Sequence, residues 1–223
     1  MTRQLLVIDG IDGSGKTRFA RRLEQTCRQH GLAPTLLRVD DYRCRIEWDR
    51  VADEASAYYD DYYDFAALDA DLRAFAAGAA EIEVPTWDSI SERVTGRHRV
   101  GFEPDALLLL EGVFTLQVPA ARDGTLLYLH TSFPEARRRI IARDVAKNRS
   151  HPEVERRIDR RYFPSQKRYH REHAPREHAH LVIDNENPAQ PRAVTGDVGH
   201  LPTGLRQAID DLLGAPTTTG ADL

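Results

Sequence analysis

The apolar positions of this chain fall into short, nearly continuous runs that are separated by amphipathic stretches. The runs lie at residues 5–8, 34–39, 106–110, 125–130 and 181–184. Continuous apolar runs of this length are typical of strands that are buried on both faces of a parallel sheet. Patterns of helical period occupy residues 18–30, 65–77, 134–147, 151–174 and 205–213. This alternation predicts an α/β fold with a doubly wound, mainly parallel sheet and helices on both faces.

Three segments are less regular. Residues 81–87 alternate as a strand does, and the polar, turn-rich residues 88–101 suggest a hairpin. Residues 43–64 are polar and aromatic, which leaves a packed helix and an ordered loop as alternatives.

The last third of the chain contains further interruptions. Pro164 and Pro175 are expected to break the helical stretch 151–174. Residues 188–204 show little periodicity and are expected to form a loop. The polar tail that contains Thr217–Gly220 is expected to be disordered.

Residues 10–17 follow the first apolar run and read Gly-Ile-Asp-Gly-Ser-Gly-Lys-Thr. They match the phosphate-loop pattern GxxxxGK[ST] in the context that this pattern requires, between a buried strand and a helix. Glycines allow successive N–H groups to point inward and form an anion-binding nest at the helix N-terminus. The residues expected to hold ATP are Gly10, Asp12, Gly13, Ser14, Gly15, Lys16 and Thr17. Thr17 is also a candidate ligand of Mg²⁺.

Carboxylates follow two other predicted strands. The carboxyl ends of parallel strands face the ligand crevice, so Asp40 and Asp41 are expected beside the phosphate loop. Asp40 is the better candidate for a base that accepts a hydroxyl proton, although a cap or turn role is the alternative. Glu111 closes the most apolar strand, where an unpaired carboxylate would be costly, so a metal or metal-bound water is the favoured partner.

Charge is unevenly distributed along the chain. The 31 Lys and Arg residues against 35 Asp and Glu give no overall attraction to nucleic acid or to a membrane. Residues 131–178 nevertheless carry 14 basic against 7 acidic side chains. In a protein with a phosphate loop, such a block is expected to close over a polyphosphate. Arg139 and Arg143 lie one helical turn apart and should share one face.

The two cysteines, Cys27 and Cys44, lack a metal-binding spacing and fit a reducing compartment without disulfides. The first strand begins within four residues of the N-terminus, and no apolar run approaches membrane-spanning length. We therefore expect a soluble, cytoplasmic protein. The sequence leaves the oligomeric state open, with a homo-oligomer among the alternatives.

Several short motifs together resemble the uridine kinase family, within the wider group that contains phosphoribulokinase and pantothenate kinase. The motifs are Asp40-Asp41-Tyr42, Tyr63-Asp64, Pro85-Thr86-Trp87-Asp88, Leu110-Glu111-Gly112, Arg139 to Arg143-Asp144, and Ala179 to Asn185. The resemblance covers residues 4–188. It implies a P-loop kinase fold with a small helical lid and an ATP-dependent, Mg²⁺-requiring transfer to a hydroxyl group.

The resemblance also assigns catalytic roles. It makes Asp40 the base that accepts the proton of the acceptor hydroxyl. It also implies that Glu111 helps to bind the metal, with Thr17 and Asp40 as further metal ligands. Lys16, Arg139 and Arg143 supply positive charge, the two arginines from a lid at about residues 139–165. Residues 1–188 would form the kinase domain, and residues 189–223 a C-terminal extension with a short helix.

On the acceptor side, Asp64 is similar in position to an aspartate that binds ribose hydroxyls in this family. Trp87 and Asp88 match an aromatic residue and an aspartate that help to form the nucleoside pocket. Uridine kinases usually carry a histidine and then an arginine after that pocket, whereas this chain has Ser89-Ile90-Ser91-Glu92-Arg93. A nucleoside such as uridine or cytidine is the lead acceptor, with Arg93 at its site. A pantothenate-like or sugar-like acceptor and a non-catalytic ATP-binding module stay open as alternatives.

Overall fold

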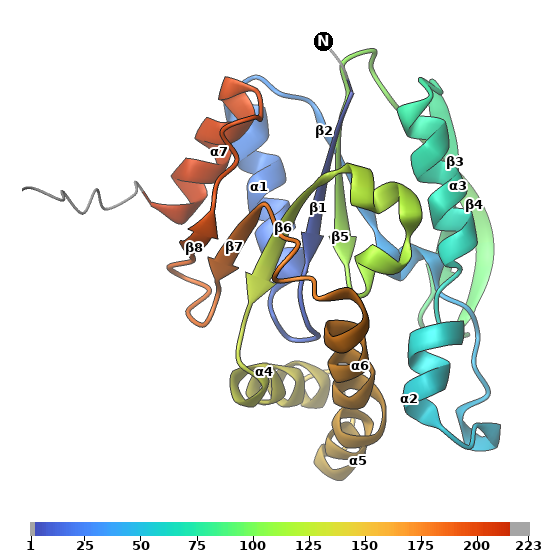
Figure 1. Ribbon diagram of the computed structural model, residues 1–223. Helices are drawn as coiled ribbons and strands as arrows, with labels where there is room; N and C mark the ends of the chain where they lie inside the picture. Colours follow the sequence, from blue (N-terminus) through green and yellow to red (C-terminus); the bar gives the residue numbers. More distant parts are fainter. Residues whose placement is uncertain (1–2, 215–223) are drawn as a thin grey trace, which may run out of the picture.

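The computed structural model describes residues 3–214, which form a six-stranded sheet between layers of helices (Figure 1). In spatial order, the strands of this sheet are β2 (Pro34–Arg38), β5 (Leu107–Gly112), β1 (Gln4–Asp9), β6 (Thr125–His130), β7 (Leu181–Asp184) and β8 (Arg192–Gly196). The first five are parallel, and β8 is antiparallel to β7. The expected doubly wound, mainly parallel sheet is confirmed.

The helices are α1 (Lys16–Gln29), α2 (Glu54–Ser56), α3 (Phe65–Ala76), α4 (Phe133–Val145), α5 (His151–Arg157), α6 (Phe163–His173) and α7 (Thr203–Leu213). Figure 1 shows α1 and α7 side by side on one face of the sheet, with α3 on the other side. A separate hairpin of β3 (Glu81–Asp88) and β4 (Arg93–Gly101) confirms the hairpin expected from the sequence.

The central strand β5 shows why the apolar runs are continuous. Leu107 and Leu109 pack in the cluster that contains the buried faces of α1 and α7. Leu108 and Leu110 pack in the opposite cluster, together with α3. Because successive side chains of a strand point to opposite faces, a strand covered on both sides requires an apolar residue at every position.

The segment 43–64 is ordered and mostly helical, but not as one helix. It contains a 3-10 turn (Trp48–Arg50), the short α2 and a π-helical turn (Ala57–Asp61). Tyr58 and Tyr59 are buried here and meet Phe114 edge to face. The segment therefore packs by its aromatic rings, which a search for helical periodicity does not detect.

The expectation that Pro164 breaks a helix was wrong. The chain stays helical from α5 through a π turn (Ile158–Tyr162) into α6, with Pro164 in the first turn of α6. A π turn shifts the pattern of backbone hydrogen bonds, and the missing N–H of a proline is tolerated at such a position. Pro175, by contrast, follows the end of α6 as expected.

The expectation of a loop over residues 188–204 was also wrong in part, because β8 lies within it. All five residues of β8 are exposed, so the strand has no buried face and gives no apolar signal. Hydrogen bonds to β7 define it, with an irregularity in register between Val182 and Ile183.

The chain beyond residue 188 contributes to the core. Val198, Leu201, Ala208 and Ile209 belong to the same buried cluster as β1 and α1. His30 at the end of α1 also contacts Asp211 of α7, at 2.8 Å between Nε2 and Oδ2. The expected disorder of the tail concerns residues 215–223, which lie outside the described residues.

Two further properties bear on the sequence-based expectations. Cys27 and Cys44 are both free thiols. Within residues 3–214, no helix is both long enough and apolar enough to cross a membrane.

We predict that Ile209→Ala lowers the free energy of unfolding by about 2–5 kcal/mol, because Ile209 is fully buried between α7 and the sheet. Denaturant unfolding of the full chain measures this change. The neighbouring Asp210 is exposed, and Asp210→Ala should change stability by less than about 0.5 kcal/mol. Equal effects of the two substitutions would show that α7 is not part of the cooperative core.

Candidate active site

The phosphate loop connects β1 to α1 at the carboxyl edge of the sheet, and two of its glycines have conformations that side chains rarely adopt. Gly13 has φ 79° and Gly15 has φ 94°. A Cβ on Gly13 would lie 2.6 Å from the carbonyl oxygen of Ala136, and one on Gly15 would lie 2.8 Å from Nδ2 of Asn185. The loop is therefore enclosed by α4 on one side and by the chain after β7 on the other.

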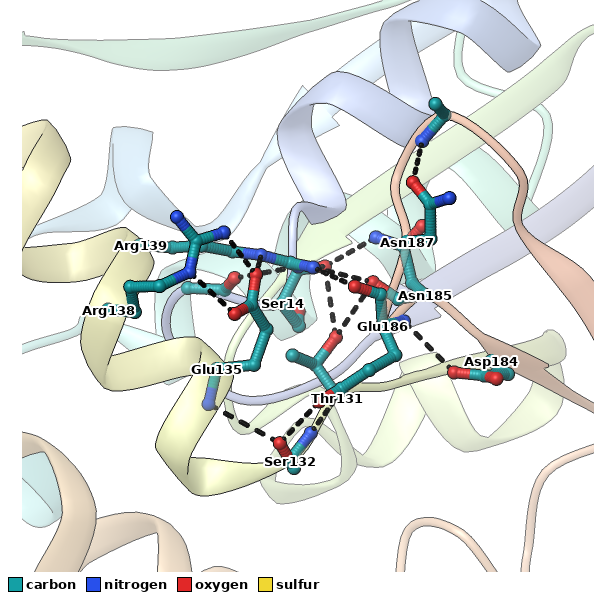
Figure 2. Close-up of polar contacts among 12 residues, drawn as sticks. Ser14, Thr131, Ser132, Glu135, Arg138, Arg139, Asp184, Asn185, Glu186 and Asn187 are labelled. Atoms are coloured by element: carbon teal, nitrogen blue, oxygen red, sulfur yellow. Dashed lines mark hydrogen bonds and ion pairs between the residues drawn. The ribbon is translucent and has the colours of Figure 1, made fainter.

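The carbonyl groups of the loop are held by donors from outside it. Arg139 of α4 extends between two backbone segments, as Figure 2 shows. Its guanidinium donates to the carbonyls of Gly13 at 3.3 Å and Ser14 at 3.4 Å, and to those of Asn185 at 2.9 Å and Glu186 at 2.8 Å. The Asn185 side chain donates a further hydrogen bond of 2.6 Å to the Ser14 carbonyl.

A cavity of about 310 Å³ opens on the loop. It brings together most of the catalytic, ATP-binding and metal-binding residues predicted from the sequence: Asp12, Gly13, Gly15, Lys16, Thr17, Asp40, Glu111, Arg139 and Arg143. Ser14 is fully buried behind it. Gly10 precedes the turn, and its carbonyl and that of Ile11 each accept a 2.9 Å hydrogen bond from Nζ of Lys16.

The oxygen atoms in this cavity fit the ligand preference of Mg²⁺. Thr17 Oγ1 donates to Oε1 of Glu111 at 2.9 Å, and Glu111 is 4% exposed. Burial raises the pKa of Glu111, and Lys16 only partly opposes this. A cation beside the carboxylate would favour its ionised form. Thr17, Glu111 and Asp40 are the residues of this cavity that could hold Mg²⁺.

Asp12, a loop residue, is half-buried and lines the cavity. Its Oδ2 accepts hydrogen bonds from the Tyr58 hydroxyl at 3.0 Å and from Nε2 of Gln166 at 2.5 Å. Burial raises the pKa of Asp12, and Lys16 and Arg143 oppose the increase. These contacts connect the loop to the π turn of 57–61 and to α6.

The two aspartates after β2 point to different partners. Asp40 forms an ion pair with Arg43, and its Oδ1 accepts a 3.3 Å hydrogen bond from the Tyr63 hydroxyl. Asp41 instead pairs with Arg38, at 2.5 Å from Oδ1 to Nη2. Asp40 lines the cavity and Asp41 does not.

The residues predicted for the acceptor lie outside this cavity. The Asp64 carboxylate caps α3 by accepting from the Ala67 N–H at 2.9 Å. Asp88 accepts from the Ile90 N–H and the Ser91 hydroxyl in the tip of the hairpin. Trp87 and Arg93 belong to β3 and β4 of that hairpin. The structure thus gives Asp64 and Asp88 local roles in capping and turn formation.

Sequence reasoning missed several residues that support the loop. Tyr169 of α6 and Thr115 both donate 2.5 Å hydrogen bonds to Oδ2 of the buried Asp9, at the end of β1. Asn185 was noted as part of a motif, but its contact with the loop was not anticipated. Its position directly after a buried strand, at the carboxyl edge of a parallel sheet, was the available signal. Nothing in the sequence pattern points to Tyr169.

Comparison with solved structures shows that this chain shares its fold with proteins described as kinases. A possible uridine kinase from Bacillus stearothermophilus superposes with a TM-score of 0.64 and 23% identity, over 82% of this chain and 89% of that chain. A putative fructose transport system kinase from Silicibacter also gives 0.64, with 17% identity over 76% of this chain and 85% of that chain. No protein-family model matches the sequence, and no curated protein matches it. At these identities, the likeness concerns the fold.

We predict that Arg139→Ala lowers the free energy of unfolding by about 2 kcal/mol or more, because it removes the guanidinium hydrogen bonds to four backbone carbonyls on two separate segments. Urea denaturation measures the loss. Arg138, the residue before Arg139 on α4, is exposed and pairs with Glu135, so Arg138→Ala should cost less than about 1 kcal/mol. An Arg139 variant as stable as the Arg138 variant would contradict the role of Arg139 as a clamp on the loop.

Proposed function

From the fold that this chain shares with uridine kinase-like P-loop kinases, we propose that it is an ATP-dependent kinase acting on a hydroxyl group of a small molecule. One observation carries the proposal: Asp40 lines two adjoining cavities. The first is the cavity at the phosphate loop. The second, of about 390 Å³, lies beyond it and shares with it Asp12, Asp40 and Arg143. With ATP in the first and the acceptor in the second, Asp40 stands between them.

The proposed reaction needs little covalent chemistry from the protein. The acceptor oxygen attacks the γ-phosphorus of ATP, the bond to the β–γ bridging oxygen breaks, and ADP leaves. The proton of the acceptor hydroxyl passes to a carboxylate oxygen of Asp40. Arg43 and Tyr63 orient this carboxylate through the contacts described above.

Positive charge around the transferred group supports the proposal. Lys16 and Arg143 both line the phosphate cavity, and the side chain of Arg143 is 47% exposed. Cations placed in advance where charge moves stabilise the transition state of phosphoryl transfer. When bound, Mg²⁺ would add to this charge at Thr17 and Glu111. Arg139, which the sequence groups with Arg143, is already occupied by backbone carbonyls.

The identity of the acceptor is a separate part of the proposal. A nucleoside is the acceptor implied by the resemblance, through Asp64, Trp87, Asp88 and Arg93. The lining of the second cavity includes Ser89 and Glu92 of the hairpin but none of those four residues. Uridine and cytidine therefore belong in any acceptor panel beside sugar-like and pantothenate-like compounds. Cytoplasmic location and a possible homo-oligomer stay predictions of the sequence.

We predict that Asp40→Asn lowers kcat by about 10²–10⁴-fold, because the amide keeps the shape of the side chain but cannot accept the proton. ATP affinity should change little, since the loop that holds the phosphates is intact. ADP release in the presence of acceptor measures kcat, and binding of an ATP analogue measures affinity.

Asp41→Asn is the matched control, because Asp41 pairs with Arg38 and lies outside the cavities; its effect should be much smaller. If Asp41→Asn abolished activity and Asp40→Asn stayed active, the catalytic base would be Asp41 rather than Asp40. ADP release that is independent of every acceptor would instead favour an ATPase, and binding without release would favour a regulatory module.

A further inference from the structure

The second cavity is unusually rich in positive charge for a site that accepts a neutral molecule. Its wall carries six cationic side chains and four carboxylates. The cations are Arg43, Arg143, Lys147, Arg149, Arg157 and Arg161. Tyrosine side chains line the same wall, including Tyr58, Tyr62 and Tyr162. Burial raises the pKa of each of these three hydroxyls, so they stay neutral and add no negative charge.

The charges are partly separated within the cavity, because two of the four carboxylates, Glu92 and Asp144, line it together with the cations and the other two lie elsewhere. Asp12 and Asp40 are shared with the phosphate cavity and lie at its side. Lys147, Arg149 and Arg157 line the second cavity alone and do not line the first. ATP phosphates in the loop therefore do not account for these three cations.

The partners of these cations leave positive charge facing the cavity. Within residues 3–214, the ammonium group of Lys147 makes no hydrogen bond or ion pair, although its charge helps to lower the pKa of Asp144, and the residue is exposed between α4 and α5. Arg157 pairs with Glu153 at 2.6 Å, and Glu153 does not line the cavity. Arg149 approaches Asp144 at 3.4 Å, but the Asp144 side chain is 2% exposed and also bound by Arg143.

We propose that the phosphoryl acceptor itself carries a negatively charged group, a phosphate or a carboxylate, which binds against Lys147, Arg149 and Arg157. The hydroxyl to be phosphorylated would then face Asp40 at the other side of the same cavity. This inference rests on the proposed kinase function, whose substrate class it narrows. Guanidinium groups bind both anions through paired hydrogen bonds, and a cavity of this size accommodates a sugar phosphate or a sugar acid.

A neutral nucleoside would bind this wall poorly. It offers no anion to the three cations, and binding would remove water from them without giving them a partner. An acceptor that bears an anionic group makes charge-assisted hydrogen bonds there, which are about twice as strong as neutral ones. The same wall thus favours one class of acceptor and rejects the other.

The test uses the full chain with Mg²⁺ and the non-hydrolysable imido analogue of ATP, so that the phosphate loop is filled. Calorimetry then compares D-ribose 5-phosphate with D-ribose, and D-gluconate with D-glucose. We expect the charged member of at least one pair to bind about tenfold tighter or more. The pair that shows the difference identifies phosphate or carboxylate as the group recognised. Equal affinities within both pairs, or no binding by any probe, would overturn the inference.

Lys147→Gln locates the anion, because Lys147 is exposed and its replacement should not disturb folding. It should weaken binding of the charged probe by about fivefold or more and leave the neutral probe unchanged. Arg160→Gln removes the same charge from an exposed position in the π turn between α5 and α6, outside the cavity, and should have no effect. If Lys147→Gln and Arg160→Gln changed the affinity for the charged probe equally, the anion would not bind at Lys147. The same conclusion would follow if both Lys147→Gln and Arg149→Gln kept the preference for the charged probe over the neutral one.

A parallel assay of ADP release with ATP and Mg²⁺ separates the two proposals. One outcome is that the charged probes bind in a way that depends on Lys147, but that no probe, tested singly or in a mixture, supports ADP release. This result would refute the proposed kinase activity and would still support the anion-binding site. If uridine or D-ribose were phosphorylated as efficiently as the charged acceptors, the anion-binding site would be refuted and the proposed kinase activity would still be supported.

Discussion

The structure depends on how the peptide groups of the phosphate loop are satisfied. In each peptide unit the N–H and the C=O point in opposite directions, so a loop that turns its N–H groups toward a phosphate turns carbonyls toward the protein. Buried carbonyls need donors. Arg139 from α4 and Asn185 after β7 supply them to Gly13 and Ser14. The same arginine also holds the backbone of residues 185 and 186, so the loop, α4 and the end of the sheet form one unit (Figure 2).

This constraint explains the order of the surrounding elements. The parallel strands bring Asp40, Glu111 and Asn185 to one edge, although they are far apart in sequence. In Figure 1, α4, α5 and α6 lie beyond the carboxyl ends of these strands. Tyr169 of α6 reaches Asp9, and Gln166 reaches Asp12, so α6 is connected to both ends of the turn. The lid expected at about residues 139–165 ends just before these two contacts and stays a prediction of the sequence.

Much of the fold could be predicted from the sequence, because strands such as Leu107–Gly112 are apolar at every position and the loop pattern needs only its glycines and Lys16-Thr17. The failures have physical causes. β8 has no buried face, and the π turn before Pro164 depends on hydrogen bonds rather than on periodicity. Arg139 was predicted as a cation for phosphate, but sequence spacing shows only which helix face it shares with Arg143. It cannot show that carbonyls lie within reach.

The acceptor side was the least predictable part of the site. Asp64 and Asp88 match a family motif, yet their carboxylates accept hydrogen bonds from nearby backbone groups. The cavity beside Asp40 is built instead from segments that no single motif contains, including Arg43, Lys147 and Arg157. The direct measurement is the fate of a radiolabelled γ-phosphate of ATP, incubated with the protein, Mg²⁺ and a panel of neutral and anionic hydroxyl compounds. Our account predicts label in an organic phosphate ester of an anionic acceptor; label that stays in ATP, or appears only as inorganic phosphate, would contradict it.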